Sequence, residues 1–272
     1  MKREATIEEI KRIQLNMLSV LHKFCEENNL TYYLSAGTLL GAVRHKGYIP
    51  WDDDIDICMP RADYMRFLSE YNDNPLDKNL KVVSIESEKD YYLPFAKMIN
   101  QRTILCEECD TDFEIGVYLD IFPLDNMSSD YRNAKRLLYQ VERWRNILMI
   151  KNLLPSPQRA RKKNALIKIG KVLFYGVSRR RILKKIDTLS RKYENNQKSE
   201  YCGAVCDAIY GEGEIMPSDW FAERVLVNFE GLEFFAPAKY ENVLKNLYND
   251  YMELPPIDKR CSHHRFKVVM EE

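Results

Sequence analysis

The 272-residue sequence lacks any apolar run approaching the roughly 20 residues that a membrane-spanning helix needs. Its first residues, Met1 to Glu4, lead into an amphipathic pattern and not into the apolar segment of a signal peptide. With 45% hydrophobic and 30% charged residues, it also lacks the composition of a disordered chain. We therefore expect a globular cytoplasmic protein, whose membrane contact, if it has any, is peripheral at the inner face.

The seven cysteines lack the even number and regular spacing of a disulfide framework, so reduced thiols are expected. Cys106 with Cys109, and Cys202 with Cys206, could together supply four thiolates to a structural zinc. No sequence feature links these two distant pairs. Free cysteines are therefore the favoured interpretation, and a zinc site stays an open alternative.

The densest chemistry lies between Ser35 and Ile57, where three glycines, a basic cluster and four carboxylates share an otherwise apolar segment. From Asp54 to Met59 polar and apolar residues alternate, which is typical of a half-buried strand. Asp54 and Asp56 would then share one face of that strand. Adjacent carboxylates beside an apolar face repel one another unless a cation neutralises them, and oxygen ligands suit Mg²⁺ or Mn²⁺.

The residues before these acids predict an anion-binding turn. Thr31 to Leu34 indicates a short strand, Gly37 and Thr38 a turn, and Leu39 to Arg44 the start of a helix. Such a turn points backbone N–H groups at an anion. We expect Gly37, Thr38 and Arg44 to contact phosphate.

A second acid-bearing strand is predicted further along the chain. Val117, Leu119 and Ile121 face one way in this pattern, which leaves Asp120 on the other face. Before it, Lys97 lies in an apolar setting from which it could reach a phosphate or extend to water.

The run from Gly37 to Asp56, Gly-Thr-Leu-Leu-Gly-Ala-Val-Arg-His-Lys-Gly-Tyr-Ile-Pro-Trp-Asp-Asp-Asp-Ile-Asp, resembles the signature of the LicD family of phosphocholine transferases and a segment of fukutin-related protein. The resemblance implies an α/β (α+β) fold with a nucleotidyltransferase-like mixed sheet. It implies that Asp54, Asp56 and Asp120 are catalytic and hold one or two Mg²⁺ or Mn²⁺ ions, with Lys97 in the site.

The resemblance also implies an activity. Phosphocholine from CDP-choline would be transferred to a hydroxyl group of a teichoic acid or lipopolysaccharide type of glycan, or of its lipid-linked precursor, and CMP would be released. A nucleotidyltransferase using a nucleoside triphosphate, transfer of another CDP-linked alcohol such as ribitol or glycerol, and a non-catalytic scaffold are the alternatives. Aromatic residues that could hold choline are Trp51, Tyr48, Tyr91 and Tyr92, and the sequence does not choose among them.

Charge is distributed unevenly along the chain. Lys plus Arg and Asp plus Glu each number 41, yet residues 131–192 contain 19 basic residues and only two acids, Glu142 and Asp187. Helical spacing predicts three helices in this segment. It would pack on the acidic remainder, bind nucleic acid or contact an anionic membrane or polyanionic acceptor. Sparse base-stacking aromatics disfavour nucleic acid. The resemblance to LicD enzymes, which decorate lipid-linked or surface glycans, implies the membrane or acceptor, and we favour that interpretation.

We therefore divide the chain into a catalytic core (1–128), a basic helical insertion (129–200) and a C-terminal segment that completes the core and the site (201–272). This last segment predicts a hairpin over 229–237 and a helix over 240–251. The Ser-His-His sequence near the end resembles the family's C-terminal pattern. That likeness implies that His263 or His264 folds back to the phosphate.

Overall fold

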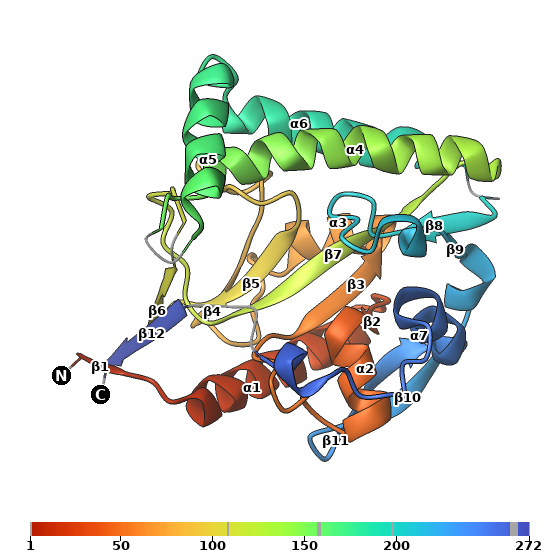
Figure 1. Cartoon of the computed structure of the whole chain (residues 1–272). Coiled ribbons are helices and arrows are strands. Elements are labelled where there is room, and N and C mark those ends of the chain that lie inside the picture. The colour runs from red at the N-terminus through yellow and green to blue at the C-terminus, as the bar shows by residue number, and fades with distance from the viewer. Residues whose placement is uncertain (1, 108, 157–158, 197–198, 262–265, 272) are drawn as a thin grey trace.

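The computed structural model describes residues 2–107, 109–156, 159–196, 199–261 and 266–271 (Figure 1). Its centre is a seven-stranded mixed sheet in which β2, β3, β7, β5 and β4 are neighbours in that order, with β8 and β9 continuing from β7. The α/β fold with a mixed sheet that the sequence predicts is confirmed. The strands of this sheet are β2 (Tyr33–Leu34), β3 (Asp56–Pro60), β4 (Leu80–Val83), β5 (Ala96–Asn100), β7 (Tyr118–Asn126), β8 (Tyr201–Gly203) and β9 (Met216–Pro217).

Seven α-helices lie in the described residues and surround this sheet. The helices are α1 (Ile7–Glu27), α2 (Ala36–His45), α3 (Arg61–Glu70), α4 (Tyr131–Asn152), α5 (Arg161–Leu173), α6 (Arg179–Ser190) and α7 (Tyr240–Tyr248). None of the helices within the described ranges is both long and apolar enough to cross a membrane.

Strands β3 and β7 are parallel, and their register places Asp56 directly opposite Asp120. The alternation predicted for β3 holds, because Ile55, Ile57 and Met59 are all fully buried. The apolar face therefore fixes which way the strand faces, since a slip of one residue would turn every side chain over. Asp56 and Asp120, which are far apart in the sequence, thereby lie side by side near the start of two neighbouring strands.

Helix α1 braces both of these strands from below, as Figure 1 shows. Its N-terminus is closed by a capping box between Thr6 and Glu9. From its buried face, Gln14 Nε2 donates to the carbonyl of Asp53 at 3.0 Å and to that of Tyr118 at 3.4 Å. One amide group thus ties the segment before β3 to the start of β7.

Two smaller sheets complete the core. The predicted hairpin is present as β10 (Arg224–Phe229) and β11 (Leu232–Pro237), and Glu230 at its tip accepts the N–H of Tyr48 at 3.0 Å. Sequence periodicity did not predict the second sheet, in which β12 lies between β1 and β6. Its strands are β1 (Lys2–Glu4), β6 (Thr103–Glu107) and β12 (Phe266–Glu271).

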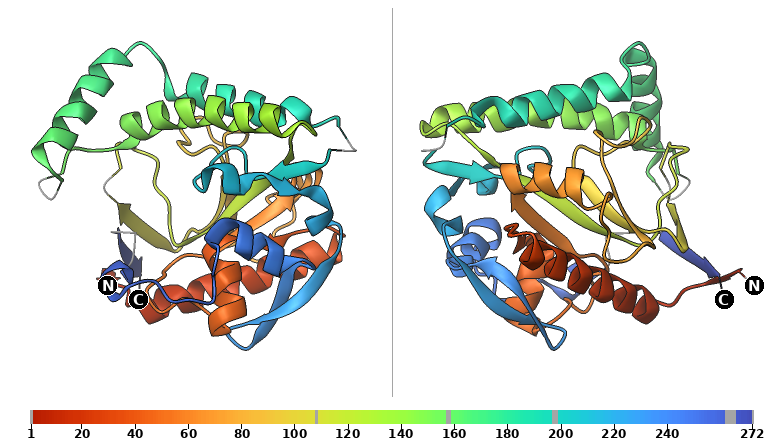
Figure 2. Two further views of the ribbon diagram at one scale, coloured as in Figure 1. Left: turned by 45° about the vertical axis from the view of Figure 1, so that its right-hand side comes forward. Right: turned by 180° about the vertical axis from the view of Figure 1, so that it is seen from behind.

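The three helices predicted in the basic segment are confirmed as α4, α5 and α6. Helices α4 and α6 run side by side across one side of the molecule, and α5 projects from one end of the pair (Figures 1 and 2). They share an apolar core with the chain after β8, formed by Leu137, Leu138, Val141, Ile182, Leu183, Ile186, Val205 and Ile215, among others.

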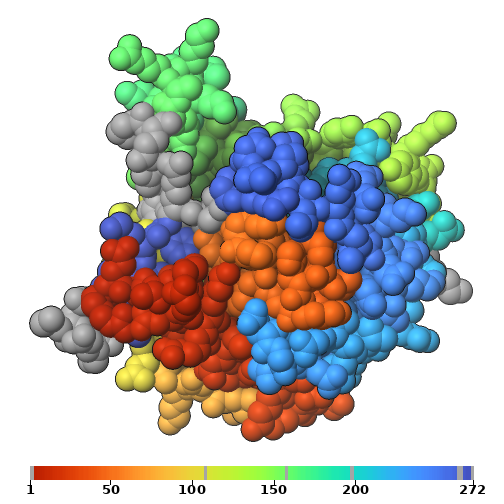
Figure 3. Space-filling view, turned by 60° about the horizontal axis from the view of Figure 1, so that its bottom comes forward, coloured from red at the N-terminus to blue at the C-terminus, as the bar shows by residue number. Residues whose placement is uncertain are grey.

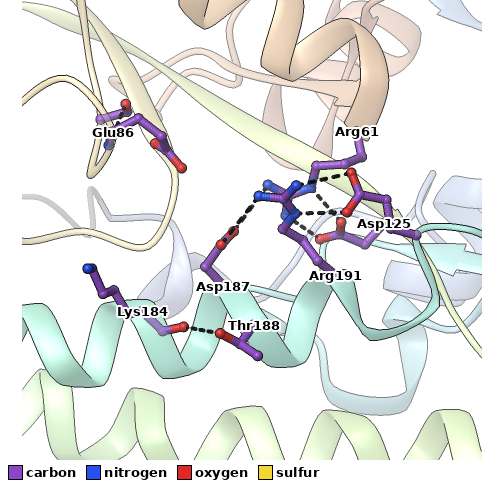
Figure 4. A network of polar contacts seen from close by, with 9 residues as sticks. Arg61, Glu86, Asp125, Lys184, Asp187, Thr188 and Arg191 are labelled. Atoms are coloured by element: carbon purple, nitrogen blue, oxygen red, sulfur yellow. Dashed lines mark hydrogen bonds and ion pairs between the residues drawn. The ribbon is translucent and has the colours of Figure 1, made fainter.

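A buried ion-pair network joins α6 to the sheet (Figure 4). Arg61 binds Asp125 through two contacts of 2.7 and 2.8 Å and reaches Asp187 on α6 at 3.4 Å. Burial raises the pKa of Asp125 to about 6, although Arg61 opposes that shift. Asp125 follows Pro123 in a turn-like sequence, but Asp130 is the cap of α4 and Asp125 is the buried partner of Arg61.

We predict that Asp125→Asn destabilises the fold by about 3–5 kcal/mol, because it leaves the guanidinium of Arg61 buried without its counter-charge. Urea unfolding followed by circular dichroism measures this cost. The double variant Arg61→Met with Asp125→Leu should recover most of it, whereas Arg66→Met, which breaks an exposed pair with Glu70, should cost less than about 1 kcal/mol. Equal costs for Asp125→Asn and Arg66→Met would contradict the prediction.

Candidate functional site

The carboxylates of Asp54, Asp56 and Asp120 meet where β3 and β7 begin. Each offers an oxygen atom that lies within 4.8 Å of the oxygens of the other two. The three acids that the sequence singled out therefore form one cluster. In a second group, Asp52, Asp53 and Asp54 each offer an oxygen that lies within 4.8 Å of the oxygens of the other two.

Burial makes this cluster electrostatically unfavourable by itself. The pKa of Asp56 is raised well above its ordinary value, first by loss of solvent and then by the charges of Asp54 and Asp120. Hard oxygen donors in a repulsive, desolvated group are the ligand set that a divalent cation such as Mg²⁺ prefers. The donor set therefore fits such a cation.

Lys97 partly offsets these charges. Its Nζ lies 2.5 Å from Asp120 Oδ1, and it sits 3.2 Å from the centroid of the Tyr118 ring. Because Lys97 is buried on β5 next to β7, it supports Asp120 from inside the sheet and does not line the cleft. Its position suits a residue that orients a carboxylate.

The start of α2 lies against the same acids. Ala36 has a positive φ of 43°, and a Cβ on Gly37 would lie 2.7 Å from Asp52 Oδ2. Only a glycine therefore lets the Asp52 carboxylate approach this backbone. Thr38 is buried, and its hydroxyl accepts the N–H of Asp56 at 2.8 Å, so it fixes the start of β3.

A cleft of about 860 Å³ opens above the three acids. Predicted residues that line it are Gly37, Arg44, Trp51, Asp54, Asp56 and Asp120. Its far wall is the chain that follows α7. Figure 3 shows blue C-terminal residues packed against the orange surface around α2. The cleft is acidic and aromatic in character.

Arg44 and Trp51 take part in building that wall. Arg44 Nη1 donates to the carbonyls of Tyr251 at 2.7 Å and Glu253 at 3.3 Å, which ties α2 to the C-terminal segment. Trp51 stacks against Arg260, whose guanidinium carbon is 5.6 Å from the ring centroid. The predicted residues His263 and His264 lie outside the described residues.

The aromatic residues of the cleft are mostly not those that the sequence suggested. Of the four candidates, Trp51 lines the cleft, whereas Tyr48, Tyr91 and Tyr92 are elsewhere. The cleft instead contains Phe95, Phe122, Tyr210, Tyr248 and Tyr251. Tyr210 and Tyr248 share a hydrogen bond of 2.6 Å between their hydroxyl groups.

Asp207 is a further acid of the cleft that sequence reasoning missed. It lies in the turn after β8 and contacts Arg145 Nη1 on α4 at 3.4 Å. Asp207 and Tyr210 follow closely after Cys206, in a segment that the sequence indicated only as a source of zinc ligands. Among the described residues, the clusters suited to a metal consist of aspartates and do not include the four cysteines of that alternative.

A side pocket opens from the cleft next to Asp56. Asp56, Phe122, Asp207 and Tyr210 line both spaces, and the pocket continues to Phe221 and other apolar residues. Glu214 lies in the pocket wall, and burial together with the charge of Asp207 raises its pKa from 4.5 to about 8. At neutral pH the Glu214 carboxyl is therefore largely protonated.

We predict that Glu214 makes folding pH-dependent. Between pH 4.5 and 8 the folded protein holds a proton on Glu214 that the unfolded chain releases, so the free energy of unfolding falls as pH rises. The loss should be on the order of 4 kcal/mol.

Glu214→Gln should flatten this fall, which thermal unfolding at pH 5.0 and pH 8.5 would detect. Glu212→Gln, two residues away and exposed, is the matched control and should keep the wild-type slope. Parallel slopes for wild type and Glu214→Gln would show that this carboxyl is ionised in the folded protein.

Comparisons with known proteins agree with the geometry of the acids. A family model described as "LicD/FKTN/FKRP, nucleotidyltransferase domain" matches residues 29–146, which include all three clustered aspartates. The lipopolysaccharide cholinephosphotransferase LicD of Haemophilus influenzae is 29% identical over 273 residues, covering 96% of this chain and 97% of that protein.

Two further relatives match over shorter lengths. An uncharacterized protein of Rickettsia typhi is 44% identical over 62 residues, covering 22% of this chain and 20% of its own. An uncharacterized protein of Rickettsia prowazekii is 52% identical over 42 residues, covering 15% and 16%. The family-model match spans the acid cluster, and the Haemophilus relative aligns along nearly the whole chain, so the resemblance to LicD enzymes that the sequence suggested is confirmed.

Proposed function

We propose that this enzyme transfers phosphocholine from CDP-choline to a hydroxyl group of a lipopolysaccharide-type glycan or its lipid-linked precursor and releases CMP. The observation that carries the proposal is the cluster of Asp54, Asp56 and Asp120 at the base of a cleft, beside the start of α2. The activity named for the Haemophilus relative supports phosphocholine and lipopolysaccharide as the transferred group and acceptor. A cytoplasmic location, as the sequence suggests, belongs to the same proposal.

The same three aspartates would hold one or two Mg²⁺ or Mn²⁺ ions, because their oxygens converge and their mutual repulsion calls for a counter-charge. When bound, such an ion would neutralise phosphate charge and stabilise the charge that develops on the phosphorus oxygens. Lys97 would act as a positioning residue that offsets the charge of Asp120 and holds its carboxylate toward the cleft.

The chain's own groups suit an in-line displacement at phosphorus. The acceptor oxygen would form a bond to the phosphorus of phosphocholine while the bond from that phosphorus to the bridging oxygen of CMP breaks. A cleft carboxylate would take the hydroxyl proton, and CMP would leave with the bridging oxygen. The N–H groups at the start of α2, around Gly37, would face the phosphates.

The mouth of the side pocket suits the trimethylammonium end of choline. A quaternary ammonium has no hydrogen to donate, so aromatic faces and nearby carboxylates recognise it. Phe122, Tyr210 and Asp207 supply both kinds of group where pocket and cleft join, next to Asp56. A neutral alcohol such as ribitol or glycerol would gain much less from this acid.

We predict that the purified enzyme with Mg²⁺, CDP-choline and a lipopolysaccharide acceptor releases CMP, and that Asp120→Asn lowers this rate at least 100-fold. Chromatography of the nucleotides measures the product. CDP-ribitol, CDP-glycerol, nucleoside triphosphates and a teichoic acid acceptor are run in parallel. Pyrophosphate from a triphosphate, with no CMP from any CDP-linked alcohol, would replace the proposal with nucleotidyl transfer.

We predict that Mg²⁺ or Mn²⁺ raises the melting temperature of the wild type without substrate, because it binds the folded acid cluster preferentially. Asp54→Asn and Asp56→Asn should abolish the rise. Asp63→Asn, an acid on α3 outside the cluster, should retain it. A rise of equal size in all variants would place the cation elsewhere.

We predict that Asp207→Asn lowers kcat/KM for CDP-choline about 10- to 100-fold and changes that for CDP-glycerol little, because only choline carries a positive charge. Competition between the two donors measures the ratio directly. Asp250→Asn removes the same charge from another part of the cleft lining and serves as the control. An equal loss for both donors would show that Asp207 has no part in recognising choline.

A further inference from the structure

Helix α5 carries its apolar side chains on the outside of the protein. Its exposed side presents large apolar side chains with exposed fractions between 55% and 87%, and they continue into the turn after the helix. These residues are Leu166, Ile169, Val172, Leu173 and Tyr175. Figures 2 and 3 show the α5 region projecting from one corner of the molecule.

The inner face of α5, which packs on the rest of the protein, consists of few residues. Ile167 and Gly170 are the buried residues of the helix, and a Cβ on Gly170 would lie 2.7 Å from Ile150 on α4. Lys171 and Arg179 bind Asp110, which fixes both ends of the α5–α6 connection to the body. The outward apolar face is therefore held in place by packing on its opposite side.

Helical geometry groups these side chains into a single stripe. Positions 166 and 169, and 169 and 172, are three residues apart, and 169 and 173 are four apart, so all four positions lie along one face of the helix. Exposed basic residues border the stripe, namely Arg161, Lys163 and Lys168, and Lys162 lies at its N-terminal end. From Arg143 to Ile186 the chain contains no acidic residue at all.

This combination has a specific physical meaning. An apolar face bordered by lysine and arginine, on a helix of 13 residues that is too short to span a bilayer, suits a helix that lies in the plane of a membrane surface. The apolar side chains would enter the boundary between headgroups and acyl chains. The basic side chains would contact lipid phosphates.

A second copy of the chain fits this face less well. Pairing two α5 helices through their stripes would bring two sets of basic side chains together, and like charges across an interface oppose association. An anionic lipid surface instead complements both the apolar and the charged part of the face.

We propose that α5 docks the enzyme on anionic bilayers by inserting its stripe of Leu166, Ile169, Val172 and Leu173 between the lipid headgroups. This inference deepens the proposed function and rests on it in one respect, because a lipid-linked acceptor would be presented at such a surface. Binding to lipid needs no catalysis, so the two proposals can fail separately.

The test is flotation of the full-length protein with vesicles of phosphatidylglycerol and phosphatidylcholine, and with vesicles of phosphatidylcholine alone. The wild type should float with the anionic vesicles in 50 mM salt, where the electrostatic screening length is about 14 Å. Binding should fall in 500 mM salt. The triple variant Ile169→Gln, Val172→Gln and Leu173→Gln should bind at least ten-fold more weakly.

A matched variant controls for loss of apolar surface in general. Leu226→Gln, Leu232→Gln and Ile257→Gln alter three exposed apolar residues elsewhere and should leave flotation unchanged. Lys162→Gln, Lys163→Gln and Lys168→Gln should weaken binding to anionic vesicles and reduce its salt dependence. Circular dichroism of each variant verifies that it is folded.

Three results would overturn the proposal. The wild type could fail to float with anionic vesicles in 50 mM salt, or the α5 triple variant could bind as well as the wild type. Light scattering could also reveal a dimer that the α5 triple variant, and not the matched control, loses. That result would assign the stripe to a second copy of the chain.

Discussion

The parallel pairing of β3 with β7 is the constraint on which the rest of this structure depends. Its register sets Asp56 beside Asp120, and the buried isoleucines of both strands fix that register because any slip would expose them. The cost is a concentration of negative charge in a desolvated place. Lys97 offsets part of it from within the sheet, and Gln14 and Thr38 hold the backbone on either side. Much of the surrounding polar structure therefore serves to keep mutually repelling carboxylates together.

The sequence predicted this arrangement well wherever one periodic pattern carried the information. Alternation identified the face of Asp54 and Asp56 and the strand of Asp120, and helical spacing identified the three basic helices and α7. Each of these signals is local, since it depends on which side of a single element is buried. That Asp120 joins Asp54 and Asp56 in one site came from the resemblance to a family, because pairing between distant strands leaves no trace in either strand alone.

Contacts made by side chains far apart in the chain were the features that could not be predicted. Arg44 has the charge that a phosphate ligand needs, yet its Nη1 atom is directed at backbone carbonyls after α7. Asp125 follows a proline in a turn-like context but is the buried partner of Arg61. Asp207 and Tyr210 reach the cleft because β8 pairs with the end of β7, a contact that spans the whole basic segment. In each case the residue type indicated a polar or charged role, but the sequence did not reveal which residue it contacts.

Helix α4 connects the cleft with helix α5. Arg145, near its middle, contacts Asp207 in the cleft, and its last turn packs against α5 through Ile150. An α-helix is stiff over this length, so a tilt imposed at one end displaces the side chains along it. Displacing α4 at its contact with α5 would therefore also shift Arg145 relative to Asp207 and change the charge that faces the cleft.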